Sequence, residues 1–98
     1  MQDIKQLRKR IDEVDEQILQ SLSERAEICR CIGQVKERSG LPVQDFPREN
    51  TVYAHIREKA AELGLAPSHV EAVYRQIVRM CSAIQDSERK RSETKLEN

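Results

Sequence analysis

Apolar residues in the first 38 positions recur at alternating spacings of three and four. One row repeats every seven residues and consists of Ile4, Ile11, Ile18 and Ile32. A second row consists of Leu7, Val14, Ile28 and Val35, with Ser21 as its small polar member. Two rows at these spacings form one apolar stripe on an α-helix.

The stripe predicts a helix from about Asp3 to Arg38. Asp3 is a suitable helix cap, and Ser39-Gly40 followed by Pro42 is a strong stop signal. At a rise of about 1.5 Å per residue this helix is roughly 54 Å long, about three times the usual length in globular proteins.

Two shorter helices are predicted after a connector at residues 41–46. Pro47 suits the first turn of the second helix, and Gly64 ends it. Pro67 opens the third helix. The apolar faces of these two helices consist of Val52, Ile56, Ala60 and Leu63, and of Val70, Val73, Ile77, Met80 and Ile84. Residues 87–98 are almost all polar, so we expect a domain of residues 1–86 and a frayed tail.

This pattern predicts an all-α fold with one very long and two shorter helices per chain. A chain of 98 residues is too short to bury every apolar stripe of three such helices by itself. We therefore expect a homodimer in which the first helix packs on its copy in the partner subunit.

Arg25 occupies the one gap in the isoleucine row. A guanidinium is always charged, so it must be paired or bound to a ligand if it is buried. Either the stripe stops being buried at Arg25, or it opens there onto an anion.

Composition narrows the choice of partners and location. The 17 basic and 17 acidic residues cancel, so bulk charge does not indicate nucleic acid or a membrane surface as a partner. No apolar run approaches the roughly 20 residues that span a bilayer, and the N-terminus lacks the apolar centre of a signal peptide. The three cysteines are an odd number, so we expect reduced thiols and a cytoplasmic protein. Two unclustered histidines predict no metal site.

The distances of two other basic residues from Arg25 along the first helix decide whether they can bind the same ligand. Lys36 follows by three turns and lies about 16 Å away along the axis, so both side chains could grip one small anion. Arg8 lies about 25 Å away, so it can join such a site only from a partner subunit. Alternatively, Arg8 and Lys36 are solvated surface charges.

Further candidates lie at the start of the second helix and on the third. Acidic Asp45 and Glu49 suit a helix N-terminus, whereas Arg48 is unfavourable there unless an anion or a carboxylate holds it. Cys81 and Gln85 are four residues apart and share one helix face. They are either site residues or a structural thiol and a boundary amide.

These residues together resemble the all-helical class of chorismate mutases. Residues 7–15 match that family's Leu-Arg-x-x-Ile-Asp-x-x-Asp opening, and residues 42–49 match its Pro-x-x-Asp-x-x-Arg-Glu connector. Glu24-Arg25, with Lys36 eleven residues after Arg25, matches the element between them. The resemblance extends through Gln85, and the order and spacing of the motifs make it specific.

The resemblance implies an intertwined helical dimer that rearranges chorismate to prephenate, in the pathway to phenylalanine and tyrosine, without a cofactor. Arg25, Arg48 and the partner's Arg8 would bind substrate carboxylates. Lys36 and Gln85 would hydrogen-bond the ether oxygen of the breaking bond. Asp45 and Glu49 would contact the substrate hydroxyl, with Glu49 also positioning Lys36. Cys81 falls where relatives often have a Ser or Asn that helps to bind a carboxylate.

Two alternatives stay open at this point. Isochorismate-pyruvate lyases resemble this fold and also use a cationic pocket, although Asp45 and Glu49 fit a mutase better. A non-catalytic helical dimerisation module would explain the apolar stripe but would give Arg25 no role.

Overall fold

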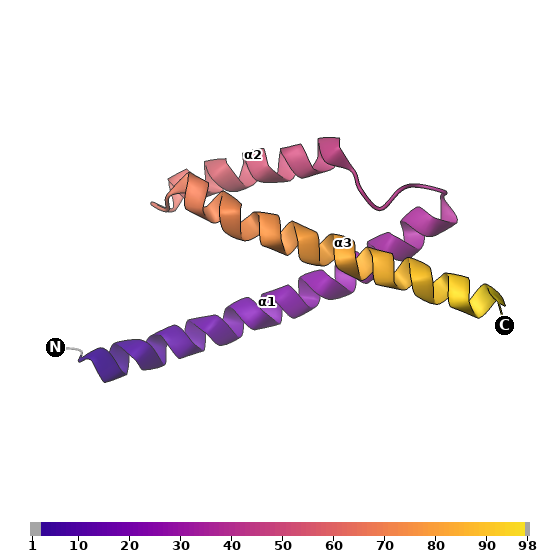
Figure 1. The fold of residues 1–98 in the computed structure, drawn as a ribbon. Helices are drawn as coiled ribbons and strands as arrows, with labels where there is room; N and C mark the ends of the chain where they lie inside the picture. Colours follow the sequence, from indigo (N-terminus) through magenta and orange to yellow (C-terminus); the bar gives the residue numbers. More distant parts are fainter. Residues whose placement is uncertain (1–2, 98) are drawn as a thin grey trace.

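The computed structural model describes residues 3–97, and its three helices within this range confirm the predicted all-α class (Figure 1). Helix α1 spans Ile4–Arg38, α2 spans Phe46–Glu62 and α3 spans Pro67–Glu97. The described part of the chain contains no β-strand.

The helix ends form where the capping residues predicted them. Asp3 and Gln6 cap α1 reciprocally, because each side chain accepts a hydrogen bond from the other residue's backbone N–H. Gly40 and Gly64 follow α1 and α2 with φ angles of 69° and 74°. This left-handed conformation turns the chain out of a helix and strains every residue except glycine.

Helix α3 continues through residues 87–97, where the polar composition predicted a frayed tail. One contact helps to hold this extension: Arg89 donates a 2.7 Å hydrogen bond to the backbone carbonyl of Leu41 in the connector. Residue 98 of the expected tail lies outside the described residues, and the domain boundary at residue 86 stays a prediction.

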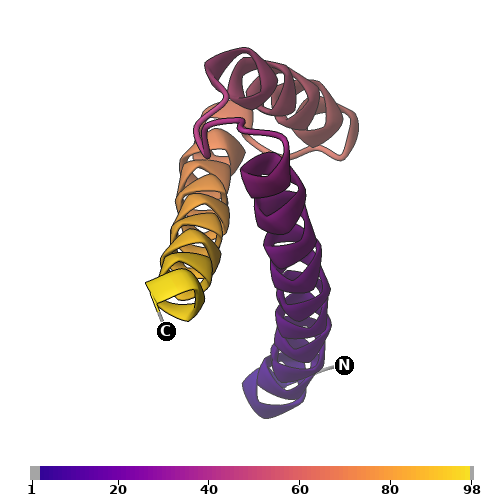
Figure 2. The same ribbon diagram turned by 90° about the vertical axis from the view of Figure 1, so that its right-hand side faces the viewer.

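Helix α3 lies between the other two helices and packs against both, whereas α1 and α2 share no direct packing. Figure 1 shows α3 crossing the C-terminal half of α1, and Figure 2 shows α2 lying across the top of the pair. The core is correspondingly small. Its buried apolar residues are Cys29, Tyr53, Ala60 and Val78.

The crossing of α1 and α3 is close because α1 presents Gly33 to the buried Gln85 of α3. A Cβ atom built on Gly33 would lie 3.2 Å from both the Cα and the Cγ of Gln85. These distances leave almost no room for a methyl group between the two helices. A glycine here lets the two backbones approach.

One turn away, a disulfide joins Cys29 of α1 to Cys81 of α3, whose Cα atoms are 5.5 Å apart. The expectation of three reduced thiols is therefore wrong for this pair, and only Cys31 is a free, exposed cysteine. An odd count leaves room for one disulfide and one free thiol. The two partners are 52 residues apart in sequence, so only the helix crossing reveals that they meet.

The N-terminal half of α1 extends away from the other helices. Every residue from Ile4 to Ser21 is exposed, including the apolar stripe. The molecule measures 62 × 29 × 15 Å and exposes 7969 Å². A compact monomer of this mass exposes about 5,800 Å². No helix in the described range is long and apolar enough to cross a membrane.

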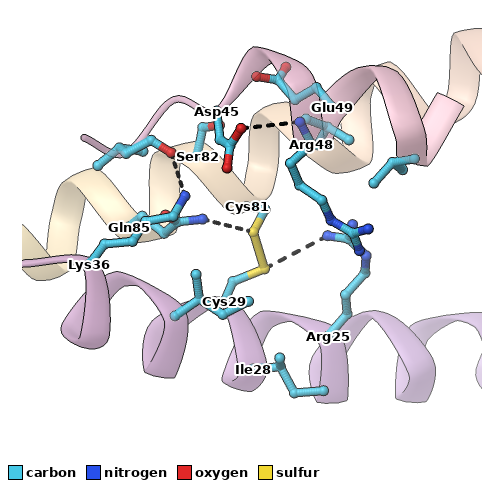
Figure 3. Close-up of a pocket in the computed structure, with 14 residues that line it drawn as sticks. Arg25, Ile28, Cys29, Lys36, Asp45, Arg48, Glu49, Cys81, Ser82 and Gln85 are labelled. Atoms are coloured by element: carbon cyan, nitrogen blue, oxygen red, sulfur yellow. Dashed lines mark hydrogen bonds between the residues drawn. A yellow bond between two sulfur atoms is a disulfide. The ribbon is translucent and has the colours of Figure 1, made fainter. Parts of the chain in front are cut away.

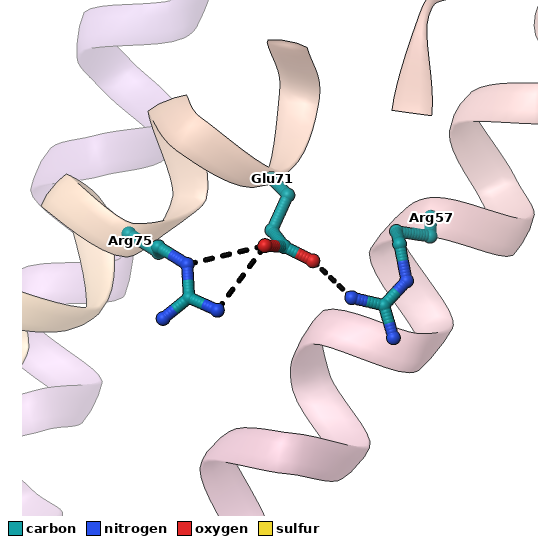
Figure 4. A network of polar contacts seen from close by, with 3 residues as sticks. All are labelled: Arg57, Glu71 and Arg75. Carbon is teal, nitrogen blue, oxygen red and sulfur yellow. Dashed lines mark hydrogen bonds and ion pairs between the residues drawn. The ribbon is translucent and has the colours of Figure 1, made fainter. Parts of the chain in front are cut away.

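Helices α2 and α3 are joined by a carboxylate that Figure 4 shows between two guanidinium groups. Glu71 of α3 accepts hydrogen bonds from Arg57 of α2 and from Arg75 of its own helix. The Arg75 guanidinium also stacks on the ring of the buried Tyr53, 4.4 Å from its centroid. The hydrogen bond from Arg57 lowers the pKa of Glu71 below 4.5; Arg75 adds to this effect, which outweighs the opposing effect of partial burial.

We predict that Gly33→Ala destabilises the protein although alanine favours helices. The added methyl group forces α1 and α3 apart, which typically costs about 1–3 kcal/mol and exceeds the helix-propensity gain of roughly 0.5–1 kcal/mol. Urea denaturation at one protein concentration measures the difference, with exposed Gln34→Ala on the same turn as the control. An increase in stability for Gly33→Ala would show that the crossing has room for a side chain.

We also predict that the Glu71 network stabilises the fold only above acidic pH. Because the folded-state pKa is lowered, this contribution is present above about 4.5 and is lost as the pH falls through the folded-state value. The urea midpoint of Glu71→Gln should therefore lie below that of the unmodified chain at pH 7, and the gap should close on acidification. Salt should reduce the gap, since both arginines are exposed. A gap that is independent of pH would contradict this role.

Candidate functional site

A cavity of about 440 Å³ lies between α1, α3 and the start of α2 (Figure 3). Seven of the eight residues predicted from the sequence line it, and they come from all three helices and the connector. They are Arg25, Lys36, Asp45, Arg48, Glu49, Cys81 and Gln85. The volume lies within the usual range of small-molecule sites.

Arg8 is the predicted site residue that does not line this cavity. It lies on the exposed N-terminal half of α1, about 25 Å along the helix from Arg25. Within one chain the two arginines therefore cannot contact one small ligand.

Arg25 and Arg48 approach the cavity from two different helices. Figure 3 shows both side chains directed into the same end of it. Neither group forms an ion pair with a carboxylate of the described residues; Arg25 instead donates a long 3.7 Å hydrogen bond to Cys29 Sγ. Two like charges that converge in this way favour an anion between them.

Lys36 lies three turns beyond Arg25, toward the opposite end of the cavity. Its Nζ donates a 2.6 Å hydrogen bond to the backbone carbonyl of Val43, which positions the ammonium group. The resemblance implied that Glu49 positions Lys36, but no ion pair joins these two described residues. The connector backbone takes that part in this structure.

The two carboxylates of the site begin α2. Asp45 is the N-cap of this helix, and its Oδ1 accepts a 3.1 Å hydrogen bond from the Arg48 backbone N–H. Glu49 follows in the first turn, where a negative charge complements the helix dipole. The cap therefore fixes the position of α2 from which the Arg48 side chain projects into the cavity.

Gln85 is the buried polar residue of the site, with 5% of its surface exposed. Its Nε2 donates a 3.2 Å hydrogen bond to Cys81 Sγ, while its Oε1 is buried without a hydrogen-bond partner. Cys81 carries no S–H because it is bonded to Cys29. It therefore cannot be the hydrogen-bond donor that the resemblance suggested while the disulfide is intact.

Some groups at the site were missed by the sequence analysis. Cys29 lines the cavity, and its position four residues after Arg25, on the same helix face, was an available signal. The Val43 carbonyl gave no signal, since every residue type offers one. The apolar wall consists mainly of Ile28, Ile32, Val52 and Val78.

The site thus presents three cations, two carboxylates and a buried amide on a partly apolar wall, an arrangement suited to a small anionic molecule. Within the described range, no three His, Cys, Asp or Glu side chains are grouped as metal ligands. These residues can position a bound anion and stabilise its charge electrostatically.

Comparison with known proteins finds relatives whose names include chorismate mutase. The chain is 34% identical over 88 residues to a bifunctional chorismate mutase/prephenate dehydratase of Aquifex aeolicus, covering 87% of this chain and 24% of that protein. It is 40% identical over 73 residues to the T-protein of Enterobacter agglomerans, covering 74% and 20%. It is 35% identical over 57 residues to a chorismate mutase of Methanocaldococcus jannaschii, covering 58% of each. The chain therefore spans less than two thirds of each relative.

A family model described as chorismate mutase type II matches residues 7–86, which contain all eight predicted site residues. This match covers most of the chain and confirms the resemblance seen in its motifs. The chain belongs to the type II chorismate mutase family.

Proposed function

We propose that this protein catalyses the rearrangement of chorismate to prephenate, the precursor of phenylalanine and tyrosine. The observation that carries the proposal is the gathering of Arg25, Arg48, Lys36 and Gln85 around one cavity. Family membership supports the same reaction.

The charges of the site suit the substrate. Chorismate is a dianion whose two carboxylates lie at different places on a small, flexible molecule. The facing guanidinium groups of Arg25 and Arg48 can hold a carboxylate through directional, paired hydrogen bonds. This contact relieves the repulsion between the two cations and folds the substrate toward the geometry in which its carbons react.

The reaction itself moves electrons within one molecule. A carbon–oxygen bond breaks while a carbon–carbon bond forms, so no atom or proton has to be supplied. Negative charge grows on the ether oxygen as its bond breaks. The Lys36 ammonium and the Gln85 amide can stabilise that charge more strongly in the transition state than in the substrate.

The contacts of these two donors hold them in the wall of the cavity. Lys36 is already directed by the Val43 carbonyl, and Gln85 by the burial of its side chain against Gly33. Binding would exchange or share these partners with the ether oxygen. Donors held in place before the reaction cost less reorganisation in the transition state.

The acidic residues fit the remaining polar group of the substrate, its hydroxyl. Asp45 uses one oxygen to cap α2, and its other oxygen can accept from a hydroxyl. Glu49 lies one turn later in the cavity lining. Carboxylates in a cationic pocket also favour a molecule that carries a hydrogen-bond donor beside its charges.

We propose further that the functional unit is a homodimer. The chain exposes roughly 2,200 Å² more than a compact monomer of its mass, and the apolar stripe of α1 is exposed along the helix. Packing this stripe on a partner subunit would cover it and would bring a second Arg8 toward the cavity. Arg8 would then bind a substrate carboxylate across the interface.

We predict that the purified chain converts chorismate to prephenate and that Arg25→Ala lowers kcat/KM by about 10²–10³-fold, with the helical content unchanged. Arg38→Ala is the matched control, because Arg38 is exposed at the end of the same helix and does not line the cavity. Faster pyruvate release from isochorismate than prephenate formation would indicate a lyase instead. A folded, unmodified chain that is inactive on both substrates, together with an Arg25→Ala dimer that is more stable than the unmodified dimer, would favour a dimerisation module.

We predict that inactive Arg8→Ala and inactive Arg25→Ala chains restore activity when their subunits exchange. One of the two sites in the mixed dimer would contain both arginines, so activity should recover toward one quarter of normal. Chromophore-labelled subunits report the exchange, and a mixture of Arg25→Ala with Arg48→Ala, which share one site within a chain, is the control. Complete exchange without recovery would exclude a contribution of Arg8 across the interface.

A further inference from the structure

Two sulfur atoms form part of the wall of the proposed substrate cavity. Cys29 and Cys81 both line it, one from α1 and one from α3, and they are joined as a disulfide. Cys29 is buried, with 3% of its surface exposed, whereas Cys81 is only half-buried. Cys81 is therefore the more accessible of the two cysteines.

Both sulfurs contact residues of the proposed chemistry. Gln85 Nε2 donates to Cys81 Sγ at 3.2 Å, and Arg25 Nη1 donates to Cys29 Sγ at 3.7 Å (Figure 3). A disulfide sulfur is a weak acceptor and has no proton to donate. The state of this pair therefore changes the donors that the cavity can offer.

We propose that Cys29 and Cys81 form a reversible thiol–disulfide modification site that lowers substrate affinity when it is oxidised. The effect on affinity rests on the proposed function, whereas the modification itself does not. In the dithiol state Cys81 regains an S–H that can donate to a substrate carboxylate. In the disulfide state this donor is lost.

Reduction also changes the shape of the wall. The two sulfurs must move from a covalent bond to non-bonded contact, at roughly 3.5–4 Å between heavy atoms. Their helices are already held together by the approach of Gly33 to Gln85. The side chains of the two cysteines therefore have to rotate, which moves their sulfur atoms relative to Arg25 and Gln85.

A low-molecular-weight disulfide that carries carboxylates, such as glutathione disulfide, suits this site as the oxidant. The cations of Arg25, Lys36 and Arg48 attract its carboxylates into the cavity. The Cys81 thiolate attacks one sulfur and releases one glutathione thiolate. The Cys29 thiolate then attacks the Cys81 sulfur of the mixed disulfide and releases the second. Two electrons pass from the cysteine pair to glutathione, and the two protons of the protein thiols leave with the products.

The test equilibrates the full chain in glutathione buffers that range from fully reduced to fully oxidised. Alkylation followed by mass spectrometry counts the thiols, with three expected in the reduced chain and one, Cys31, in the oxidised chain. Chorismate kinetics on the same samples should show a KM about fivefold higher for the oxidised chain, equivalent to one lost hydrogen bond, with kcat changed less. Dithiothreitol should reverse both changes.

Two variants separate the pair from other thiol chemistry. Cys81→Ala removes the attacking thiol and leaves only the buried Cys29, so it can form neither the disulfide nor the mixed disulfide in the cavity, and its KM should stay high at every glutathione ratio. Cys31→Ser removes the exposed thiol and should respond as the unmodified chain does. A response that disappears in Cys31→Ser but survives in Cys81→Ala would overturn the proposal.

The remaining outcomes are equally decisive. Two reactive thiols at Cys29 and Cys81 in every buffer, or a disulfide that resists excess dithiothreitol, would overturn reversible modification. Equal KM values in the two states would overturn the effect on affinity. A chain that oxidises and reduces reversibly but converts no chorismate in either state would overturn the proposed function and leave the modification site standing.

Discussion

The close crossing of α1 and α3 is the constraint on which the rest of this molecule depends. Its four described participants are Gly33, Gln85, Cys29 and Cys81, and they bring two helices together that carry most of the proposed chemistry. Arg25 and Lys36 lie on α1 on either side of the crossing. Gln85 is therefore held by packing at the crossing, and it lines the cavity together with both cations.

The electrostatics of the site follow from which charges are already paired. Glu71 shows the ordinary outcome, because two arginines surround it and neutralise it. In the cavity the charged groups form hydrogen bonds with the backbone and not with one another. Asp45 accepts from a backbone N–H as the cap of α2, and Lys36 donates to a backbone carbonyl. Three positive charges are left without carboxylate partners from the described residues. An anion that binds in the cavity can supply such a partner and would then stabilise the folded chain.

The sequence predicted the helices and the members of the site better than it predicted their contacts. Asp3, Gly40 and Gly64 act locally, so their roles could be inferred from neighbours in the chain. The approach of Cys29 to Cys81 depends on the crossing of two helices. The odd number of cysteines therefore led to the wrong prediction that both are reduced. Lys36 was expected beside Glu49 but binds the Val43 carbonyl, since backbone acceptors leave no trace in residue identity. Residues 87–97 looked like a tail, yet Arg89 finds a partner 48 positions away.

That last contact links the end of α3 to the cavity through the backbone. Arg89 binds the carbonyl of Leu41, and Lys36 binds the carbonyl of Val43, two residues further along the same connector. The connector leads directly to Asp45, whose cap orients Arg48. Cations from two different helices thus donate hydrogen bonds to two neighbouring carbonyls of this connector. The position of the connector, and with it the start of α2, therefore depends on α1 and α3 together.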